Sequence, residues 1–158
     1  MEGKIFYLTK EKLEDLKQEL VDLMVLERQK TVGVEAPKML ESEDVNPEFL
    51  SYHEDMDALR TRINDLENII KHHEIIKNPP KDQQHLVGIG AKVTMDFDGK
   101  SDEFILTGTL EANPIAGKIS NESPVGMAIL GRKVGDQITI LSPQKISYKI
   151  KNIKYEVG

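Results

Sequence analysis

The sequence predicts an α+β protein in two parts: an N-terminal antiparallel α-helical coiled-coil hairpin, then a small antiparallel sheet domain with one short helix. Three observations carry this prediction. Apolar residues recur at heptad spacing in the first half of the 158 residues and alternate with polar residues in the second half. The net charge of −6 is also unevenly divided. Residues 1–76 hold ten Lys or Arg against eighteen Asp or Glu, whereas residues 77–158 hold eleven against nine. The two halves therefore have different surfaces.

The first arm of the hairpin is predicted to begin at Lys10, after Thr9 as a helix cap. Its leucines then recur at spacings typical of a coiled-coil seam: Leu13, Leu16, Leu20 and Leu23. Gly33 and Pro37 both disfavour a helix interior, so we expect a kink or a frayed segment there.

The second arm repeats the heptad pattern after a short polar connection, at Tyr52, Met56, Leu59, Ile63, Leu66 and Ile70. Neither helix can bury its apolar stripe alone, but two arms of one chain can bury them against each other. We therefore expect residues 1–76 to form the hairpin and the protein to be a monomer.

A linker is predicted at residues 77–85, because Pro79 and Pro80 end the second helix. The sheet domain follows over residues 86–158. Apolar residues alternate at 93–97, Asp98-Gly99 is a typical hairpin turn, and residues 103–110 supply the partner strand. Further strand patterns occupy residues 136–141 and 145–157.

The short helix of the sheet domain is predicted from three residues that are typical of the start or the end of a helix. Ser123 is a good N-cap, Pro124 takes the first helical position, and Gly131 ends the helix.

Several classes of function are excluded by composition. Without cysteine there are no disulfides, zinc-thiolate sites or cysteine nucleophiles. No apolar run is long enough to cross a membrane, and the first residues lack a signal-peptide pattern, so we expect a cytoplasmic protein.

His72 and His73 are adjacent and point apart, which disfavours a metal site. The basic residues of the arms, which are Arg28, Lys30, Arg60 and Arg62, fit a solvated face with i,i+4 partners better than a nucleic-acid site.

An acidic stretch separates the two arms. Residues 41–57 hold seven carboxylates and no Lys or Arg. One interpretation is a solvated loop. The other is an acidic tip that reaches a cation held by another macromolecule, because Mg²⁺ takes oxygen ligands and is commonly held by one or two carboxylates plus waters and phosphates.

The order of parts resembles the Gre family, the bacterial transcript-cleavage and elongation factors. The opening "YLTKEKLEDLKQEL" is similar to the start of the family's first arm, and "RINDLENIIKHHEII" to its returning arm. The most specific match is "GKISNESPVGMAILGRKVGDQITI", residues 117–140, followed by "YKIKNIKYE" at the end of the chain.

This resemblance implies a fold and a partner. Gre factors pair a coiled coil with an FKBP-like domain that docks on bacterial RNA polymerase, while the coiled coil enters the secondary channel. Acidic tip residues help to retain Mg²⁺ at the polymerase active site, where the 3′ end of backtracked RNA is hydrolysed. The factor is then no enzyme itself, and it binds no cofactor stably because the Mg²⁺ is shared with the polymerase. The docking residues implied here are Ile119, Ser120, Glu122, Ser123 and Pro124.

The tip departs from the family pattern Gly-Asp-Leu-x-Glu-Asn, because residues 43–49 are "EDVNPEF". Aligning Asp44 with the family's Asp requires a deletion that removes its Glu, and a gapless alignment keeps neither acid. We expect Asp44 and Glu43 to act on the metal, with Glu41 and Glu48 as neighbouring substitutes. Stimulated cleavage is the leading hypothesis, and a non-cleaving regulator of the secondary channel is the alternative.

Two rival functions belong to other classes. A prolyl isomerase would need an aromatic-lined pocket, and the chain has no Trp, four Phe and four Tyr. A structural adaptor would pair its seam between chains, whereas an intramolecular hairpin already satisfies that seam.

Overall fold

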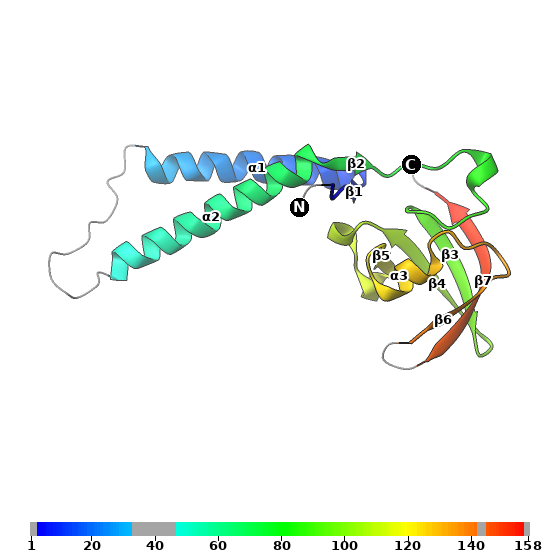
Figure 1. Cartoon of the computed structure of the whole chain (residues 1–158). Coiled ribbons are helices and arrows are strands. Elements are labelled where there is room, and N and C mark those ends of the chain that lie inside the picture. Colours follow the sequence, from blue (N-terminus) through cyan, green and yellow to red (C-terminus); the bar gives the residue numbers. More distant parts are fainter. Residues whose placement is uncertain (1–2, 33–46, 142–144, 157–158) are drawn as a thin grey trace. The chain divides into compact units, whose positions relative to one another are not determined.

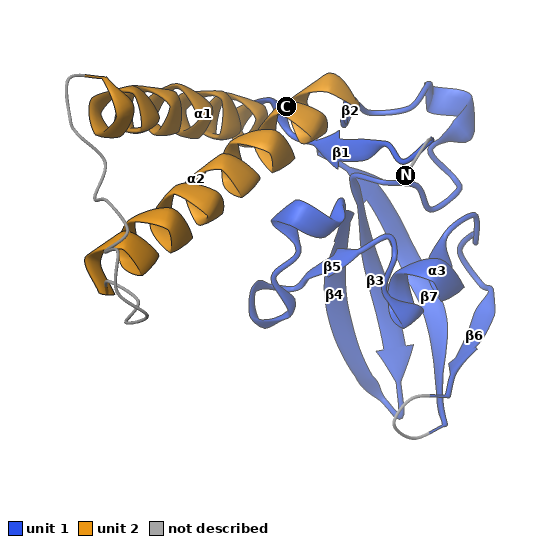
Figure 2. Ribbon diagram, turned by 60° about the vertical axis from the view of Figure 1, so that its left-hand side comes forward, with its two compact units in different colours: residues 1–10, 73–158 blue, residues 11–72 orange. Residues whose placement is uncertain are grey.

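The computed structural model describes residues 3–32, 47–141 and 145–156. The chain divides into two compact units, one of residues 1–10 with 73–158 and one of residues 11–72 (Figure 2). The first ten residues therefore group with the sheet domain, whereas the sequence analysis placed them in the hairpin. The reason is a short parallel pair of strands between β1 (Phe6–Leu8) and β2 (His73–Ile75), in which Leu8 is fully buried.

The hairpin consists of α1 (Lys10–Thr31) and α2 (Pro47–Lys71), shown in Figure 1. Helix α1 begins at the predicted residue, and α2 begins with a proline, whose missing N–H costs nothing at that position. Within the described ranges, no helix combines the length and the apolar character that a membrane span requires.

The predicted seam is confirmed near the base of the hairpin. Its buried residues are Leu13 and Leu16 of α1 and Met56, Ile63, Leu66 and Ile69 of α2. Ile69 takes the buried position predicted for Ile70, which is half-buried. A helix with 3.6 residues per turn drifts against a strict heptad, so the buried side moves by one residue.

The two helices separate toward the ends at Thr31 and Pro47 (Figures 1 and 2). Leu20 and Leu23 are only half-buried there, and Val21, Met24 and Val25 are exposed. The packing thus weakens along the hairpin. The expected irregularity at residues 33–37 lies outside the described residues.

Ion pairs between the arms brace the hairpin. The Arg62 guanidinium donates to both carboxylate oxygens of Glu19, at 2.7 and 3.0 Å. Arg60 lies 3.6 Å from the Glu27 carboxylate. The expectation of i,i+4 partners was wrong for these two arginines, because their acids lie on the opposite helix. The hydrogen bond from Arg62 is the main cause of a lowered pKa of Glu19.

The sheet domain is built on five strands in the order β5-β4-β3-β7-β6. Their bounds are β3 (Ala91–Phe97), β4 (Lys100–Thr107), β5 (Lys118–Ser120), β6 (Gln137–Ile140) and β7 (Ile146–Tyr155). The predicted turn joins β3 and β4, with Asp98 at φ 50° and Gly99 at φ 80°. Both angles suit a two-residue hairpin turn.

The sheet is mixed, whereas an antiparallel sheet was predicted. Strand β5 runs parallel to β4, and the other pairs are antiparallel. Between β4 and β5 the chain passes through the 3₁₀ turns η2 (Thr109–Glu111) and η3 (Pro114–Ala116). This connection returns the chain to the same end of the sheet, which a tight hairpin cannot do. A further 3₁₀ turn, η1 (Lys81–Gln83), lies in the predicted linker.

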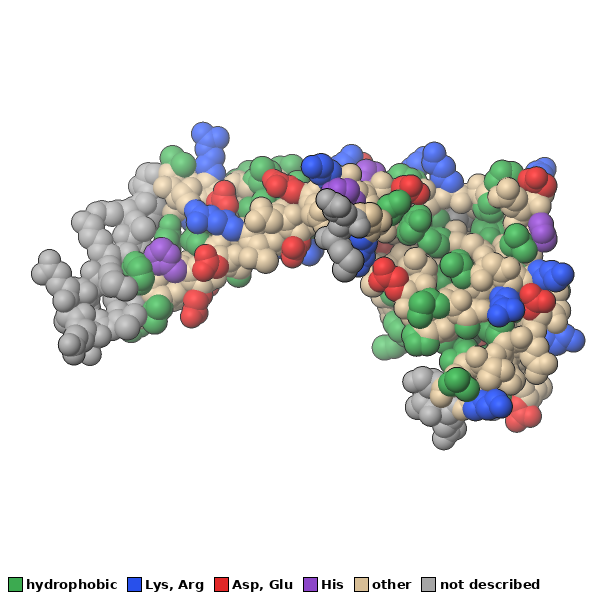
Figure 3. Space-filling view, viewed as in Figure 1, with side chains coloured by type: hydrophobic (Ala, Val, Ile, Leu, Met, Phe, Trp, Pro, Cys, Tyr) green, Lys and Arg blue, Asp and Glu red, His purple; other side chains and the backbone are tan. Residues whose placement is uncertain are grey.

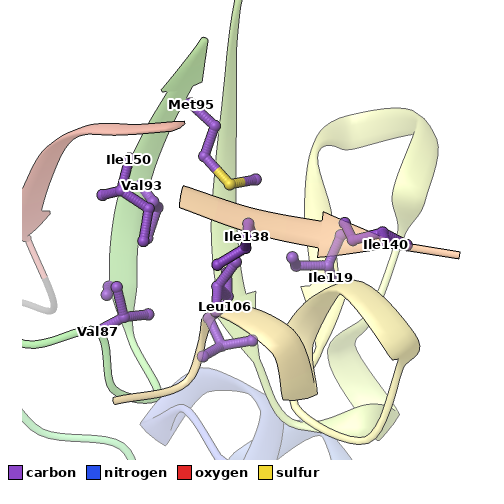
Figure 4. Packing of buried hydrophobic residues seen from close by; sticks show 10 residues of the cluster. Val87, Val93, Met95, Leu106, Ile119, Ile138, Ile140 and Ile150 are labelled. Carbon is purple, nitrogen blue, oxygen red and sulfur yellow. The ribbon is translucent and has the colours of Figure 1, made fainter. Parts of the chain in front are cut away.

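The core of the sheet domain lies between the strands and α3 (Pro124–Ile129). Figure 4 shows its side chains pointing toward one another from the strands and from the segment before β3. All members of this core are at most 8% exposed, and they include Val93, Met95, Leu106, Ile129 and Ile150. Their alternation along the strands is the pattern that predicted the sheet.

Strand β1 is held against the sheet domain at η2. A Cβ built on Gly108 would lie 2.0 Å from the backbone oxygen of Tyr7, so only glycine allows this approach. Next to it, Glu111 accepts hydrogen bonds from the Thr9 backbone N–H at 2.9 Å and from the Thr9 hydroxyl at 2.6 Å. These contacts join the residues that lead into α1 to the sheet domain.

The substitution Gly108→Ala tests this contact. Gly108 has φ −71° and ψ 160°, which alanine adopts freely, so the whole cost comes from the overlap with Tyr7. We expect the free energy of unfolding of the sheet domain to fall by about 2–4 kcal/mol in thermal or urea melts. The control Gly135→Ala, with open space around the Cβ but φ 95°, should cost only about 1 kcal/mol. Equal losses in the two variants would contradict the assignment.

The substitution Arg62→Ala tests the bracing of the hairpin. At neutral pH we expect it to destabilise the helices by about 0.5–1 kcal/mol, measured by circular dichroism at 222 nm during thermal unfolding. Because the folded-state pKa of Glu19 is lowered from 4.5, the pair stabilises the fold above that value and ceases to do so as the pH falls through the lowered pKa. The difference between wild type and variant should therefore shrink as the pH falls through the lowered pKa of Glu19. A constant difference would show that Arg62 acts through packing alone.

Candidate functional site

The predicted site residues fall on two separate segments of the chain. Three of the tip acids, Glu41, Glu43 and Asp44, lie outside the described residues. Glu48 is described and lies exposed in the first turn of α2. The predicted docking residues are all described, and they form the loop from the end of β5 to the start of α3, residues 119–124, which we call the docking loop.

Ser123 holds the docking loop to α3. Its hydroxyl accepts a hydrogen bond from the Gly126 N–H at 3.1 Å and donates one to the Ser120 carbonyl at 2.6 Å. Pro124 occupies the first helical position, as predicted. The helix-capping interpretation of Ser123 and Pro124 is therefore confirmed.

A close approach also fixes the start of α3. A Cβ on Gly126 would lie 2.0 Å from the Ser120 carbonyl oxygen and 3.1 Å from a methyl carbon of Leu106. Glycine is thus required where the helix crosses the end of β5. The loop is consequently rigid at both of its ends.

Ile119 and Ser120 are buried, at 8% and 9% exposure. Ile119 belongs to the core cluster in Figure 4. The Ser120 hydroxyl lies 2.8 Å from the Thr109 hydroxyl and accepts a hydrogen bond from the Glu122 N–H at 3.0 Å. These two side chains support the loop from within, and their neighbours form its surface.

Glu122 is the charged member of the docking loop, and its side chain is 51% exposed. One carboxylate oxygen accepts a hydrogen bond from the Thr109 hydroxyl at 2.9 Å. The other oxygen lies 3.7 Å from the Lys4 ammonium. Sequence reasoning missed both partners, since residues 4 and 109 carry no local signal that relates them to residue 122.

Apolar side chains are exposed immediately after the loop. Met127 of α3 is 62% exposed, Leu130 is 46% exposed, and Val134 is 53% exposed. The sequence offered a signal for Met127, because the six residues of α3, PVGMAI, include no polar side chain, so a helix that covers a sheet has to expose an apolar one there. These exposed apolar side chains follow the oriented carboxylate of Glu122 closely in the chain.

The chain resembles known proteins in sequence and in fold. The family "Transcription elongation factor, GreA/GreB, C-term" matches residues 82–155. The crystal structure of the GreA factor homolog 1 (Gfh1) protein of Thermus thermophilus aligns at 22% identity and a TM-score of 0.42, covering 96% of this chain and 99% of that chain.

Two relatives are both named transcription elongation factor GreA. The one from Thermomicrobium roseum is 33% identical over 138 residues, which is 86% of this chain and 88% of the relative. The one from Mycoplasma capricolum is 37% identical over 166 residues, covering 96% and 99%. The chain belongs to the GreA/GreB family of transcription elongation factors.

A Gre factor is expected to bring carboxylates to Mg²⁺, and Glu48 is the described acid that can be tested for this. Its oxygens suit a hard cation, and the side chain is exposed at the end of α2 nearest the tip. In the part of the chain that the structure describes, no three side chains of His, Cys, Asp or Glu gather as a metal site. The expectation that Glu48 assists a metal therefore stays a prediction.

The cap of this Gre protein can be tested with Ser123→Ala. Loss of the hydrogen bond to the Gly126 N–H should lower the free energy of unfolding by about 1 kcal/mol in urea melts. Ser123→Thr retains the hydroxyl and should unfold close to wild type. If the alanine variant unfolds like wild type, the capping bond contributes nothing to the stability of the loop.

Proposed function

We propose that this Gre protein binds bacterial RNA polymerase through its sheet domain and extends its hairpin into the secondary channel. The observation that carries the proposal is the docking loop with the helix that follows it: the loop presents Glu122 and Pro124, and α3 presents Met127, within the segment that matches the family. Binding to a preformed loop costs little conformational entropy, which favours docking.

The hairpin supplies the second part of the proposed function. The acids of residues 41–48 approach the Mg²⁺ of the polymerase active site and complete the ligand set for cleavage of backtracked RNA at its 3′ end. When bound there, Mg²⁺ activates water and stabilises the developing charge on the phosphate. This chain contributes oxygen ligands and their placement. It is therefore a cofactor protein for the polymerase and no enzyme.

The bracing of the hairpin supports this role. A ligand displaced by even 1 Å loses much of its catalytic effect, so the arm that carries it has to be stiff. The ion pair between Arg62 and Glu19 and the pair between Arg60 and Glu27 resist sliding of one arm along the other. On the face shown in Figure 3, basic and acidic side chains are interspersed along the described part of the arm, a pattern that does not favour binding to nucleic-acid phosphates.

A non-cleaving regulator of the secondary channel is the second candidate. The observation that favours it is the tip sequence "EDVNPEF", which retains both family acids in neither alignment. Such a protein would occupy the channel and compete with cleaving relatives. In either case we propose that it acts in the cytoplasm as a monomer, since the seam of the hairpin is satisfied within one chain.

A transcript-cleavage assay separates these two functions. A backtracked elongation complex of the cognate polymerase is incubated with Mg²⁺ and increasing protein, and release of short 3′ RNA fragments is followed. We expect stimulation by wild type and a loss of at least about tenfold in the double variant Glu43→Ala/Asp44→Ala.

The matched control is Glu67→Ala/Glu74→Ala, which removes two exposed acids far from the tip in sequence and should stimulate like wild type. Glu48→Ala asks separately whether the described acid contributes. Inhibition of elongation without any cleavage by wild type would establish the non-cleaving alternative.

A further inference from the structure

The ion pair at Glu122 differs in kind from the other contacts of the docking loop. The Thr109 hydroxyl, at 2.9 Å, orients one carboxylate oxygen, and the Glu122 N–H is fixed by Ser120 at 3.0 Å. These two contacts place the acid from within the domain. The contact with Lys4 is 3.7 Å long, and both side chains are about half exposed. Such a surface ion pair contributes little to stability.

Lys4 also comes from a part of the chain that is anchored elsewhere. Strand β1 is held by the approach of Tyr7 to Gly108 and by the hydrogen bonds of Thr9 to Glu111. Lys4 precedes these contacts, so its ammonium can leave Glu122 without any of them breaking. Glu122 is thus an oriented carboxylate whose cation is exchangeable.

We propose that Glu122 recognises a Lys or Arg side chain on the polymerase and that this side chain displaces Lys4 when the protein docks. The inference rests on the proposed function and adds the chemistry of the partner surface. A guanidinium fits especially well, because Thr109 already orients the carboxylate and its other oxygen lies against the exchangeable Lys4 ammonium. The exposed Met127 and Leu130 add apolar contact from the adjacent helix.

Competition by Lys4 has a measurable consequence. A surface ion pair of this kind is closed in a large part of the free molecules, and the closed form does not accept the partner's cation. Removing Lys4 therefore removes a competitor, so Lys4→Ala should bind the polymerase about two- to fivefold more tightly than wild type. Glu122→Gln loses the charge that the partner recognises and should bind about tenfold more weakly.

The test is a titration of fluorescently labelled protein with cognate core RNA polymerase, read by anisotropy at two salt concentrations. The double variant Lys4→Ala/Glu122→Gln should bind like Glu122→Gln alone, because in this proposal Lys4 affects docking through Glu122 and its second contact, 5.1 Å from the centre of the Phe6 ring, does not. Wild type should also lose affinity with salt more steeply than Glu122→Gln. Matched controls are Lys100→Ala and Asp102→Asn, which remove exposed charges on β4 and should leave affinity unchanged.

Each outcome decides one point. If wild type binds, and both Lys4→Ala and Glu122→Gln bind with the same affinity as wild type, this inference is overturned and docking itself stands. Tighter binding of Lys4→Ala in the Glu122→Gln background would also overturn it, since Lys4 would then act elsewhere. If wild type does not bind, the proposed function fails together with the inference. Thermal melts of every variant confirm that each remains folded, which the exposure of both side chains leads us to expect.

Discussion

The approach of Tyr7 to Gly108 is the constraint on which the organisation of the sheet domain depends. With 2.0 Å between a built Cβ and the Tyr7 oxygen, no larger residue leaves room for β1 at that place. The approach brings Thr9 within reach of Glu111 and Lys4 within reach of Glu122. Contacts between residues about one hundred positions apart thus depend on the absence of a Cβ atom at Gly108. The N-terminal segment becomes a structural part of a domain formed mainly by the C-terminal half.

The docking loop, like β1, is held in place by close contacts that involve the backbone. Ser120 is central to it: its carbonyl accepts from Ser123 and its hydroxyl meets Thr109 and the Glu122 N–H. Gly126 lets α3 close over that carbonyl. Because the buried polar groups satisfy one another, the polar group left for a partner is the Glu122 carboxylate, which Thr109 has already oriented. A loop arranged in this way gains affinity by preorganisation and needs few contacts.

The sequence predicted those parts of the fold that depend on local chemistry. Apolar residues at heptad spacing predicted both arms of the hairpin, Asp98-Gly99 predicted the β3–β4 turn, and Ser123-Pro124 predicted the start of α3. Each of these signals acts within about one helical turn or one hairpin loop. The resemblance to the family then predicted that residues 119–124 dock, and this stays a prediction, whereas the helix capping that the residues alone indicated is confirmed.

The features that were missed depend on contacts between distant residues. The parallel β4–β5 pair results from the path of the chain through η2 and η3, and short 3₁₀ turns carry no periodic signal. Arg62 also has acids on its own helix. It pairs with Glu19 on the other arm, where its guanidinium donates a hydrogen bond to each of the two carboxylate oxygens. Lys4 lies 118 positions from Glu122, and no local pattern relates them.

The acids at the two proposed contact points are compensated in different ways. Glu122 has a cation of its own in the free protein, whereas residues 41–57 hold seven carboxylates and no Lys or Arg. An acid that is paired with a cation in the free protein, as Glu122 is, has no unbalanced charge there. Its affinity for a partner's cation is lower, because its own cation has to leave first. Acids that repel one another gain most from a bound divalent cation, since the cation removes the repulsion as it binds. Under the proposed function, this difference suits a loop that has to release the polymerase and a tip that has to attract Mg²⁺.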